Sequence, residues 1–162
     1  LINAVGYLHD DNFSPEKKVV DINKNYIEKS FAINTFSTAL LLKHFTSIMV
    51  KEKRSLFVAL SARVGSIEDN FLGGWYSYRA SKAALNQIMK TVAIEFKRKK
   101  SKIIFLSLHP GTVDTKLSKP FSNKKKLFSP SFASVKIIET LNRVTLDSSG
   151  SLIDYDGKRI PF

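Results

Sequence analysis

The sequence contains no cysteine, which excludes disulfide bonds and thiolate metal sites. Its three histidines include no pair at the spacing that metal ligands need, so we expect no metal site. No apolar run approaches the ~20 residues of a membrane-spanning helix. A chain without cysteine also suits a reducing compartment. These absences predict a cytoplasmic protein that has no membrane partner.

Acidic residues are also few, because 14 Asp and Glu stand against 26 Lys and Arg and leave a net charge of +12. Such a charge can indicate a nucleic-acid partner. However, the basic clusters at residues 51–54, 97–102 and 124–126 lie at expected helix ends or in loops. They lack the interleaved aromatic residues of a single-strand groove. We expect solvent-facing lysines and no nucleic acid; the alternative, a nucleic-acid binder, predicts salt-sensitive binding.

Apolar residues make up 43% of the 162 residues and include twelve Phe, which predicts one folded domain over residues 1–162. Continuous apolar runs predict strands at residues 1–6, 56–60, 103–108 and 151–155. Helical patterns occupy about 23–50, the segment from Tyr78 to the lysines at 97–102, and the segment after Ser129-Pro130. This alternation predicts an α/β fold with a doubly wound parallel sheet of Rossmann type.

The carboxyl ends of parallel strands are where such sheets bind ligands. Residues 3–6, 61–66 and 110–115 each follow a predicted strand. The N-terminal part of the Tyr78 helix lies at the same edge. We therefore expect the functional site where these four segments converge.

Tyr78 and Lys82 are four residues apart and share one face of the predicted helix. Because an ammonium group beside a phenol favours the phenolate, we expect Lys82 to lower the pKa of Tyr78. A phenol tuned toward the working pH can act as a general acid or base. The Y-x-x-x-K pattern alone also occurs by chance on solvated helix faces. Tyr76 is a weaker candidate, since Ala80 rather than a lysine lies four residues after it.

Three motifs together resemble the short-chain dehydrogenase/reductase superfamily. They are Ser61-Ala62-Arg63-Val64-Gly65-Ser66, Tyr78-Arg79-Ala80-Ser81-Lys82 and His109-Pro110-Gly111-Thr112-Val113-Asp114-Thr115. The resemblance spans essentially the whole chain, is strongest for C-factor-like and sniffer-like carbonyl reductases, and matches the C-terminal two-thirds of the family's domain. It implies an NAD(P)-dependent oxidoreductase that transfers hydride between nicotinamide and a small carbonyl or alcohol substrate. NADP is slightly favoured over NAD.

The resemblance also implies the catalytic roles. Tyr78 would be the general acid and base, Lys82 would assist it and bind the nicotinamide ribose, and Asn34 would hold a water of the proton relay. An asparagine in mid-helix otherwise costs stability, which supports a functional role for Asn34 independently. Ala62 takes the place of the second of the family's two serines, so for polarising the carbonyl we favour Ser61, which ends the strand, with Ser66 as the alternative.

The same resemblance implies cofactor contacts, a substrate loop and an assembly. The cofactor-binding residues would be Asn3, Gly6, Tyr78, Lys82, Pro110, Gly111, Thr112, Val113 and Thr115. Residues 113–128 would form the substrate loop, in which Phe121, Leu127 and Phe128 either cover an apolar substrate or anchor the loop. The two long helices imply a homodimer or homotetramer.

One departure from the family concerns the glycine-rich phosphate loop, T-G-x-x-x-G-x-G. Gly6 is the only glycine before Gly65, so this motif is absent from the sequence. The chain also begins, at Leu1, inside an apolar strand pattern. We therefore expect an N-terminally truncated chain that lacks roughly two and a half βα units. The alternative function is that of a truncated or degenerate relative that binds a partner without turnover.

Overall fold

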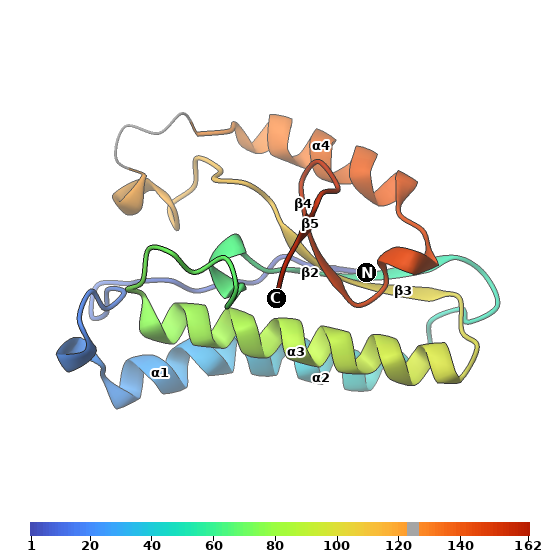
Figure 1. The fold of residues 1–162 in the computed structure, drawn as a ribbon, viewed down its shortest axis with the longest axis horizontal. Helices are drawn as coiled ribbons and strands as arrows, with labels where there is room; N and C mark the ends of the chain where they lie inside the picture. The colour runs from blue at the N-terminus through green and yellow to red at the C-terminus, as the bar shows by residue number, and fades with distance from the viewer. Residues whose placement is uncertain (123–126) are drawn as a thin grey trace.

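A computed structural model of the chain describes residues 1–122 and 127–162. Within these residues five strands form one sheet in the order β1-β2-β3-β4-β5. They are β1 (Ile2–Asn3), β2 (Ser55–Leu60), β3 (Ile103–His109), β4 (Ser151–Asp154) and β5 (Arg159–Ile160). The first four are parallel and β5 is antiparallel to β4. The predicted α/β fold with a parallel sheet is confirmed (Figure 1).

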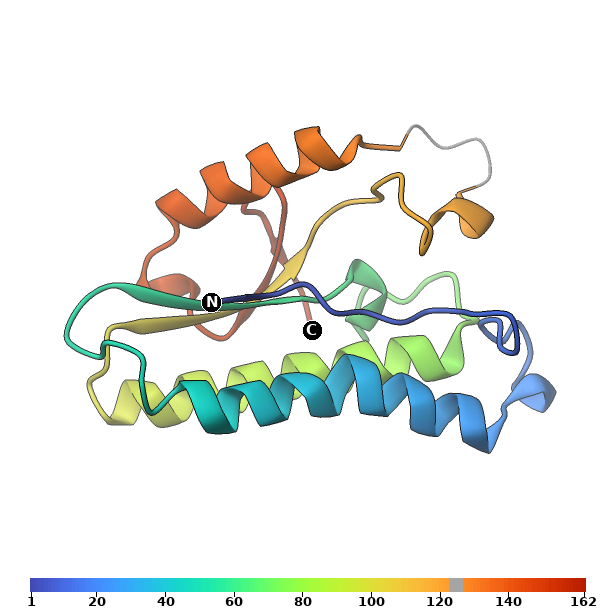
Figure 2. The same cartoon turned by 180° about the vertical axis from the view of Figure 1, so that it is seen from behind.

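Helices cover both faces of this sheet. On one face lie α1 (Lys24–Phe31), α2 (Ser37–Phe45) and α3 (Tyr76–Arg98), and on the other lies α4 (Pro130–Arg143) (Figures 1 and 2). A π-helical turn, η2 (Ala32–Phe36), joins α1 to α2, so that the three form one helical segment. Short helical turns are η1 (Val19–Asp21), η3 (Arg63–Gly65), η4 (Lys119–Phe121) and η5 (Leu146–Ser148).

The helix ends follow signals in the sequence. The Ser129 hydroxyl accepts a hydrogen bond of 3.1 Å from the Phe132 N–H, with Pro130 in the first turn, which confirms the predicted helix start. The first long helix, expected to reach about residue 50, ends at Phe45 instead. The Thr46 and Ser47 hydroxyls donate to main-chain oxygens of the preceding turn, and such bonds compete with helix continuation.

The core forms two layers, one on each face of the sheet. Alternate residues of the central strands point to opposite faces. Phe57 and Phe105 pack against α2 and α3, whereas Val58 and Leu106 pack against α4. Because both faces are covered, β2 and β3 read as continuous apolar runs in the sequence.

The first strand is shorter than predicted. Residues 1–6 were expected to be a strand, but only Ile2 and Asn3 pair with β2. The Val5 N–H donates instead to the Asn3 side chain, and the Tyr7 N–H donates to Asn34. These side-chain acceptors draw the backbone away from the sheet toward the helices. The segment after β1 is therefore a loop at the sheet edge.

The predicted substrate loop, residues 113–128, is only partly described. Residues 113–122 include η4, and Val113 forms a bridge with Phe128. The lysine cluster 124–126 lies outside the described residues. Across the described ranges, no helix combines the length and the apolar character needed to cross a membrane.

The core predicts a sharp contrast between two phenylalanines. Phe105 is fully buried, with ring centres of Phe96 and Phe57 at 5.0 and 6.2 Å, whereas Phe71 is 86% exposed. We expect Phe105→Ala to lower the free energy of unfolding by about 3–5 kcal/mol, because it leaves a cavity. Phe71→Ala should change it by less than about 0.5 kcal/mol. Urea unfolding of both variants checks this, and equal costs would contradict the described core.

Candidate active site

A cleft of about 800 Å³ lies at the carboxyl ends of β1, β2 and β3. All four segments predicted to converge contribute to it, namely residues 4–6, 61–64 and 110–113 and the first turns of α3. Phe121 of η4 and Ala133 and Ile137 of α4 also line it. The structure thus brings the predicted segments together in one hollow.

Tyr78 and Lys82 line this cleft from α3. Both side chains are nearly buried, with 7% of Tyr78 and 2% of Lys82 exposed. Lys82 Nζ donates a 2.9 Å hydrogen bond to the main-chain oxygen of Leu60, the last residue of β2. It lies 5.8 Å from the centre of the Tyr78 ring. The two side chains therefore lie next to each other, and the sheet holds the ammonium group.

Burial sets the protonation of this pair. It raises the pKa of Tyr78 to about 12 and lowers the pKa of Lys82 to about 8, since a low-dielectric environment disfavours both charged forms. The expected lowering of the Tyr78 pKa by Lys82 is therefore not seen in this structure. The helical spacing placed the two groups together, but their depth decides the direction of the shift.

Asn34 lies in the π-helical turn η2 and is 1% exposed. Its Oδ1 accepts the Tyr7 N–H at 2.8 Å, and its Nδ2 donates to the Tyr7 main-chain oxygen at 2.9 Å and to Ser81 Oγ at 3.0 Å. Because the π turn adds a residue to the helix, it turns this amide toward α3. Asn34 thus connects the first helical segment to the helix that carries Tyr78.

Gly6 lies next to both Lys82 and Asn34. A Cβ on Gly6 would be 3.8 Å from Lys82 Nζ and 3.9 Å from Asn34 Oδ1. Asn3, by contrast, is not among the residues that line the cleft. Its buried Nδ2 donates to Thr38 Oγ1 at 2.9 Å, which ties β1 to α2.

The two candidate serines lie in different environments. Ser61 lines the cleft, but its hydroxyl donates a 2.7 Å hydrogen bond to Asn86 Oδ1 on α3. Ala62, the next residue, also lines the cleft. Ser66 is not among the lining residues, and its hydroxyl accepts the Asp69 N–H at 3.0 Å. The Ser61 hydroxyl therefore already uses its proton in this structure, and the Ser66 hydroxyl lies outside the cleft.

The segment after β3 makes a tight turn at Gly111. This residue has a φ of +78°, and a Cβ on it would lie 2.6 Å from the Phe128 ring. The Phe128 N–H donates to the Thr112 main-chain oxygen at 2.9 Å, and Thr115 contacts Ser118. Gly111 therefore allows an aromatic ring to pack directly against the backbone of the cleft wall.

An aromatic cluster beside Tyr78 was not predicted. The Trp75 ring centre lies 6.1 Å from that of Tyr78 and 5.2 Å from that of Phe121, and His9 packs edge-on against Phe121 at 5.2 Å. Trp75 has a φ of 55°, a left-handed conformation that is unusual for a bulky residue. The preceding glycine pair was the available sequence signal, since glycines often accompany such turns.

The cleft lining carries positive charge. It includes Arg63, Arg79 and Lys82 but, among the described residues, no carboxylate side chain. His109 also lines it, and burial lowers the pKa of this imidazole to about 4. Its Nδ1 is buried without a hydrogen-bond partner in the described part of the chain. As far as the chain is described, no group of three His, Asp or Glu side chains could hold a metal ion.

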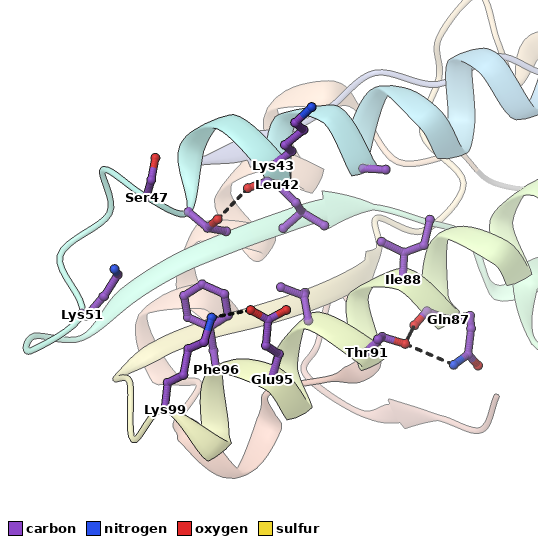
Figure 3. Close-up of a pocket in the computed structure, with 13 residues that line it drawn as sticks. Leu42, Lys43, Ser47, Lys51, Gln87, Ile88, Thr91, Glu95, Phe96 and Lys99 are labelled. Atoms are coloured by element: carbon purple, nitrogen blue, oxygen red, sulfur yellow. Dashed lines mark hydrogen bonds and ion pairs between the residues drawn. The ribbon is translucent and has the colours of Figure 1, made fainter.

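A second hollow lies between α2 and α3, away from Tyr78 (Figure 3). Leu42, Ile88 and Phe96 contribute apolar surface to it, and Lys99 forms an ion pair with Glu95 at its border. These are the two long helices through which the resemblance implies an assembly.

A parallel sheet with helical crossovers and polar residues at its carboxyl edge defines the class of doubly wound α/β proteins. Comparison with known proteins then gives the family. A family model described as short chain dehydrogenase matches residues 1–126. The chain belongs to the short-chain dehydrogenase family.

Individual relatives agree with this assignment. The 1-hydroxy-2-glutathionyl-2-methyl-3-butene dehydrogenase of Rhodococcus sp. (strain AD45) is 32% identical over 142 residues, which cover 86% of this chain and 60% of that protein. The carbonyl reductase Sniffer of D. melanogaster has a similar fold, with a TM-score of 0.82 at 23% identity. The NADPH-bound carbonyl reductase from chicken fatty liver has a TM-score of 0.83 at 24% identity.

The chain covers only part of these relatives. Both structural matches cover 100% of this chain and 65% of the other chain. Among the curated relatives that it matches, the chain spans 60% of the Rhodococcus dehydrogenase and 58% of the C-signal protein of Myxococcus xanthus.

The buried ammonium of Lys82 predicts a pH dependence of stability. Its pKa is about 8 in the folded chain against a usual 10.5, so the unfolded chain holds an extra proton between these values. Stability should therefore rise from pH 8 to about 9.5, and Lys82→Met should abolish that rise; above about pH 10 the raised pKa of Tyr78 acts in the opposite direction. Urea unfolding across this range checks it. Lys97→Met, on the exposed end of α3, controls for the lost charge. The same slope in wild type and Lys82→Met would contradict the prediction.

Proposed function

We propose that the whole protein is an NAD(P)-dependent oxidoreductase that transfers hydride between a nicotinamide and a carbonyl or alcohol substrate. The observation that carries the proposal is the burial of Tyr78 beside Lys82 in the cleft, with Lys82 Nζ held by the Leu60 oxygen. A phenol in hydrogen-bonding reach of a substrate oxygen can donate the proton that a carbonyl needs as it is reduced.

The proposed roles follow the geometry. Tyr78 gives its proton to the carbonyl oxygen in reduction and takes it back in alcohol oxidation. Lys82 places a cation beside the phenol and so favours the phenolate that remains after proton transfer. Asn34, whose amide lies beside Gly6, holds the polar path by which the proton is replaced.

The cleft suits the nicotinamide end of the cofactor. Gly6 leaves open backbone beside Lys82, and the His109 Nδ1 is a buried group without a partner in the described residues. When bound, NAD(P)H would supply hydride to the carbonyl carbon. The proposed contacts are Gly6, Tyr78, Lys82, Pro110, Gly111, Thr112, Val113 and Thr115. Asn3 would act indirectly, through the loop that ends at Gly6.

Three further proposals rest on a relative, on the cleft walls and on the second hollow. We favour NADP over NAD, because the chicken carbonyl reductase of similar fold was solved with NADPH. Residues 113–128 would form the substrate loop, and Phe121, next to Trp75, would contact an apolar small molecule. A homodimer or homotetramer would form through α2 and α3, whose hollow offers apolar surface.

A non-catalytic binding protein is the second candidate. One observation favours it: Ala62 lines the cleft where the resemblance implies a second serine. Such a protein would keep the fold but would not consume NAD(P)H.

Tyr78→Phe tests the proposal in the whole protein. The variant keeps the ring but removes the proton, and we expect kcat for NADPH-dependent carbonyl reduction to fall by about 10²–10⁴-fold. Tyr76→Phe is the matched control, because Tyr76 is 40% exposed and is not among the cleft-lining residues. It should leave kcat unchanged. Normal turnover by Tyr78→Phe would contradict the assignment of Tyr78 as the proton donor.

Ser61→Ala tests the proposed carbonyl donor. To polarise a carbonyl, the Ser61 hydroxyl must turn from Asn86 to the substrate. One such donor is typically worth about 10²–10³-fold in kcat, so we expect at least a tenfold loss. Ser66→Ala is the companion variant, and it should have little effect. If Ser61→Ala keeps full kcat and only loses stability, Ser61 serves to hold Asn86.

A further inference from the structure

The helix that carries Tyr78 begins without a cap of its own. Trp75 occupies the N-cap position in a left-handed conformation, and in the described chain its side chain makes no capping hydrogen bond. An indole ring has no oxygen that could accept from the first-turn N–H groups. Those groups need a partner when a helix start is buried.

Glu16, far away in the sequence, supplies that partner. It is 3% exposed, and its Oε2 accepts the Ser77 N–H at 3.1 Å. The Ser77 hydroxyl donates to Glu16 Oε1, and the Trp75 N–H donates to the Glu16 main-chain oxygen at 2.5 Å. Three hydrogen bonds thus join one residue of the loop before α1 to the first turn of α3.

The buried charge of Glu16 has a specific compensation. Over residues 1–122 and 127–162 it forms no ion pair. The positive end of α3 and the two donors of Ser77 face its carboxylate. A buried carboxylate without a cationic partner is costly unless its bonds are well made. These hydrogen bonds therefore fix the position of the Glu16 carboxylate at the start of α3.

The first turn of α3 is also where Tyr78 lies, directly after Ser77. Lys82, one turn later, is held independently by the Leu60 oxygen. Helix ends fray when their first turn is not fastened. Without Glu16, the phenol could move relative to the ammonium group while Lys82 stayed in place.

The same loop reaches the third residue of the site. Its first residue, Tyr7, exchanges two hydrogen bonds with the Asn34 amide, and its last part holds Glu16. One stretch of backbone, residues 7–16, therefore fastens both Asn34 and the start of α3.

From this geometry we propose that Glu16 is a positioning residue for Tyr78: its carboxylate closes the first turn of α3 and holds the phenol in register with Lys82 and Asn34. The inference rests on the proposed function of Tyr78 as proton donor. Glu16 is a buried acid that is not among the cleft-lining residues, so this role is an indirect one.

The test uses Glu16→Ala and Glu16→Gln in the whole protein, with NADPH and a panel of aldehydes and ketones. We expect kcat to fall at least tenfold in Glu16→Ala, because small misplacements of a catalytic group are expensive. The KM for NADPH should stay within threefold. Glu16→Gln, which keeps an oxygen acceptor, should recover most of the lost kcat. Hydrogen exchange at the Ser77 and Tyr78 amides should accelerate at least tenfold in Glu16→Ala.

Asp10→Asn is the matched control. Asp10 lies in the same loop and forms an ion pair with Lys29 on α1, not with α3. It should lower Tm and leave kcat within twofold of wild type, which separates loosening of the loop from displacement of Tyr78. If Glu16→Ala does not fold, Glu16→Met, which fills the same space without an acceptor for Ser77, takes its place, with the same expected loss of kcat and the same faster amide exchange.

A failure of the proposed role of Glu16 can be distinguished from a failure of the proposed function. If Tyr78→Phe is inactive while both Glu16 variants keep wild-type kcat and amide exchange, the role of Glu16 is refuted and the proposed function stands. If Tyr78→Phe itself turns over normally, the proposed function fails and this inference fails with it.

Discussion

The contact between the Lys82 ammonium and the last carbonyl of β2 is the constraint around which the candidate site is arranged. A nearly buried cation is costly, as the lowered pKa of Lys82 shows, and it needs a fixed acceptor. Leu60 can offer that acceptor only if β2 ends next to α3, which the pairing of β2 with β3 and the packing of Phe57 and Phe105 on α3 ensure. The position of Lys82 in the site therefore depends on the packing of the sheet core.

Polar contacts, rather than apolar packing, align the helices at this edge. Asn34 and Thr35 from the π turn reach Ser81 on α3, and Ser61 reaches Asn86 one turn beyond Lys82. These groups are buried, and buried polar networks specify one arrangement because an unpaired member is expensive. This network gives Asn34 a structural role inside the helical segment, where its amide bonds Tyr7 and Ser81 from the π turn.

Local signals were enough for much of the fold. The apolar runs of β2 and β3, the Ser129-Pro130 start of α4 and the convergence of four segments at one edge all follow from period and polarity. Features that depend on tertiary contacts could not be predicted from these local signals. The short β1 depends on Asn34 as a competing acceptor, and the Ser61 hydroxyl turns toward Asn86. Burial depth reverses the expected pKa shift of Tyr78, while Glu16 acts on a helix 61 residues away.

The proposed function makes this edge of the sheet a hydride-transfer site. The most direct measurement follows deuterium from NADPH that carries deuterium at both C4 positions, with the whole protein and a panel of aromatic and aliphatic aldehydes and ketones. We expect deuterium on the carbinol carbon of an alcohol product, with the hydroxyl proton taken from solvent. Oxidation of NADPH with no deuterium in any alcohol, or no reaction with any carbonyl compound of the panel, would contradict it.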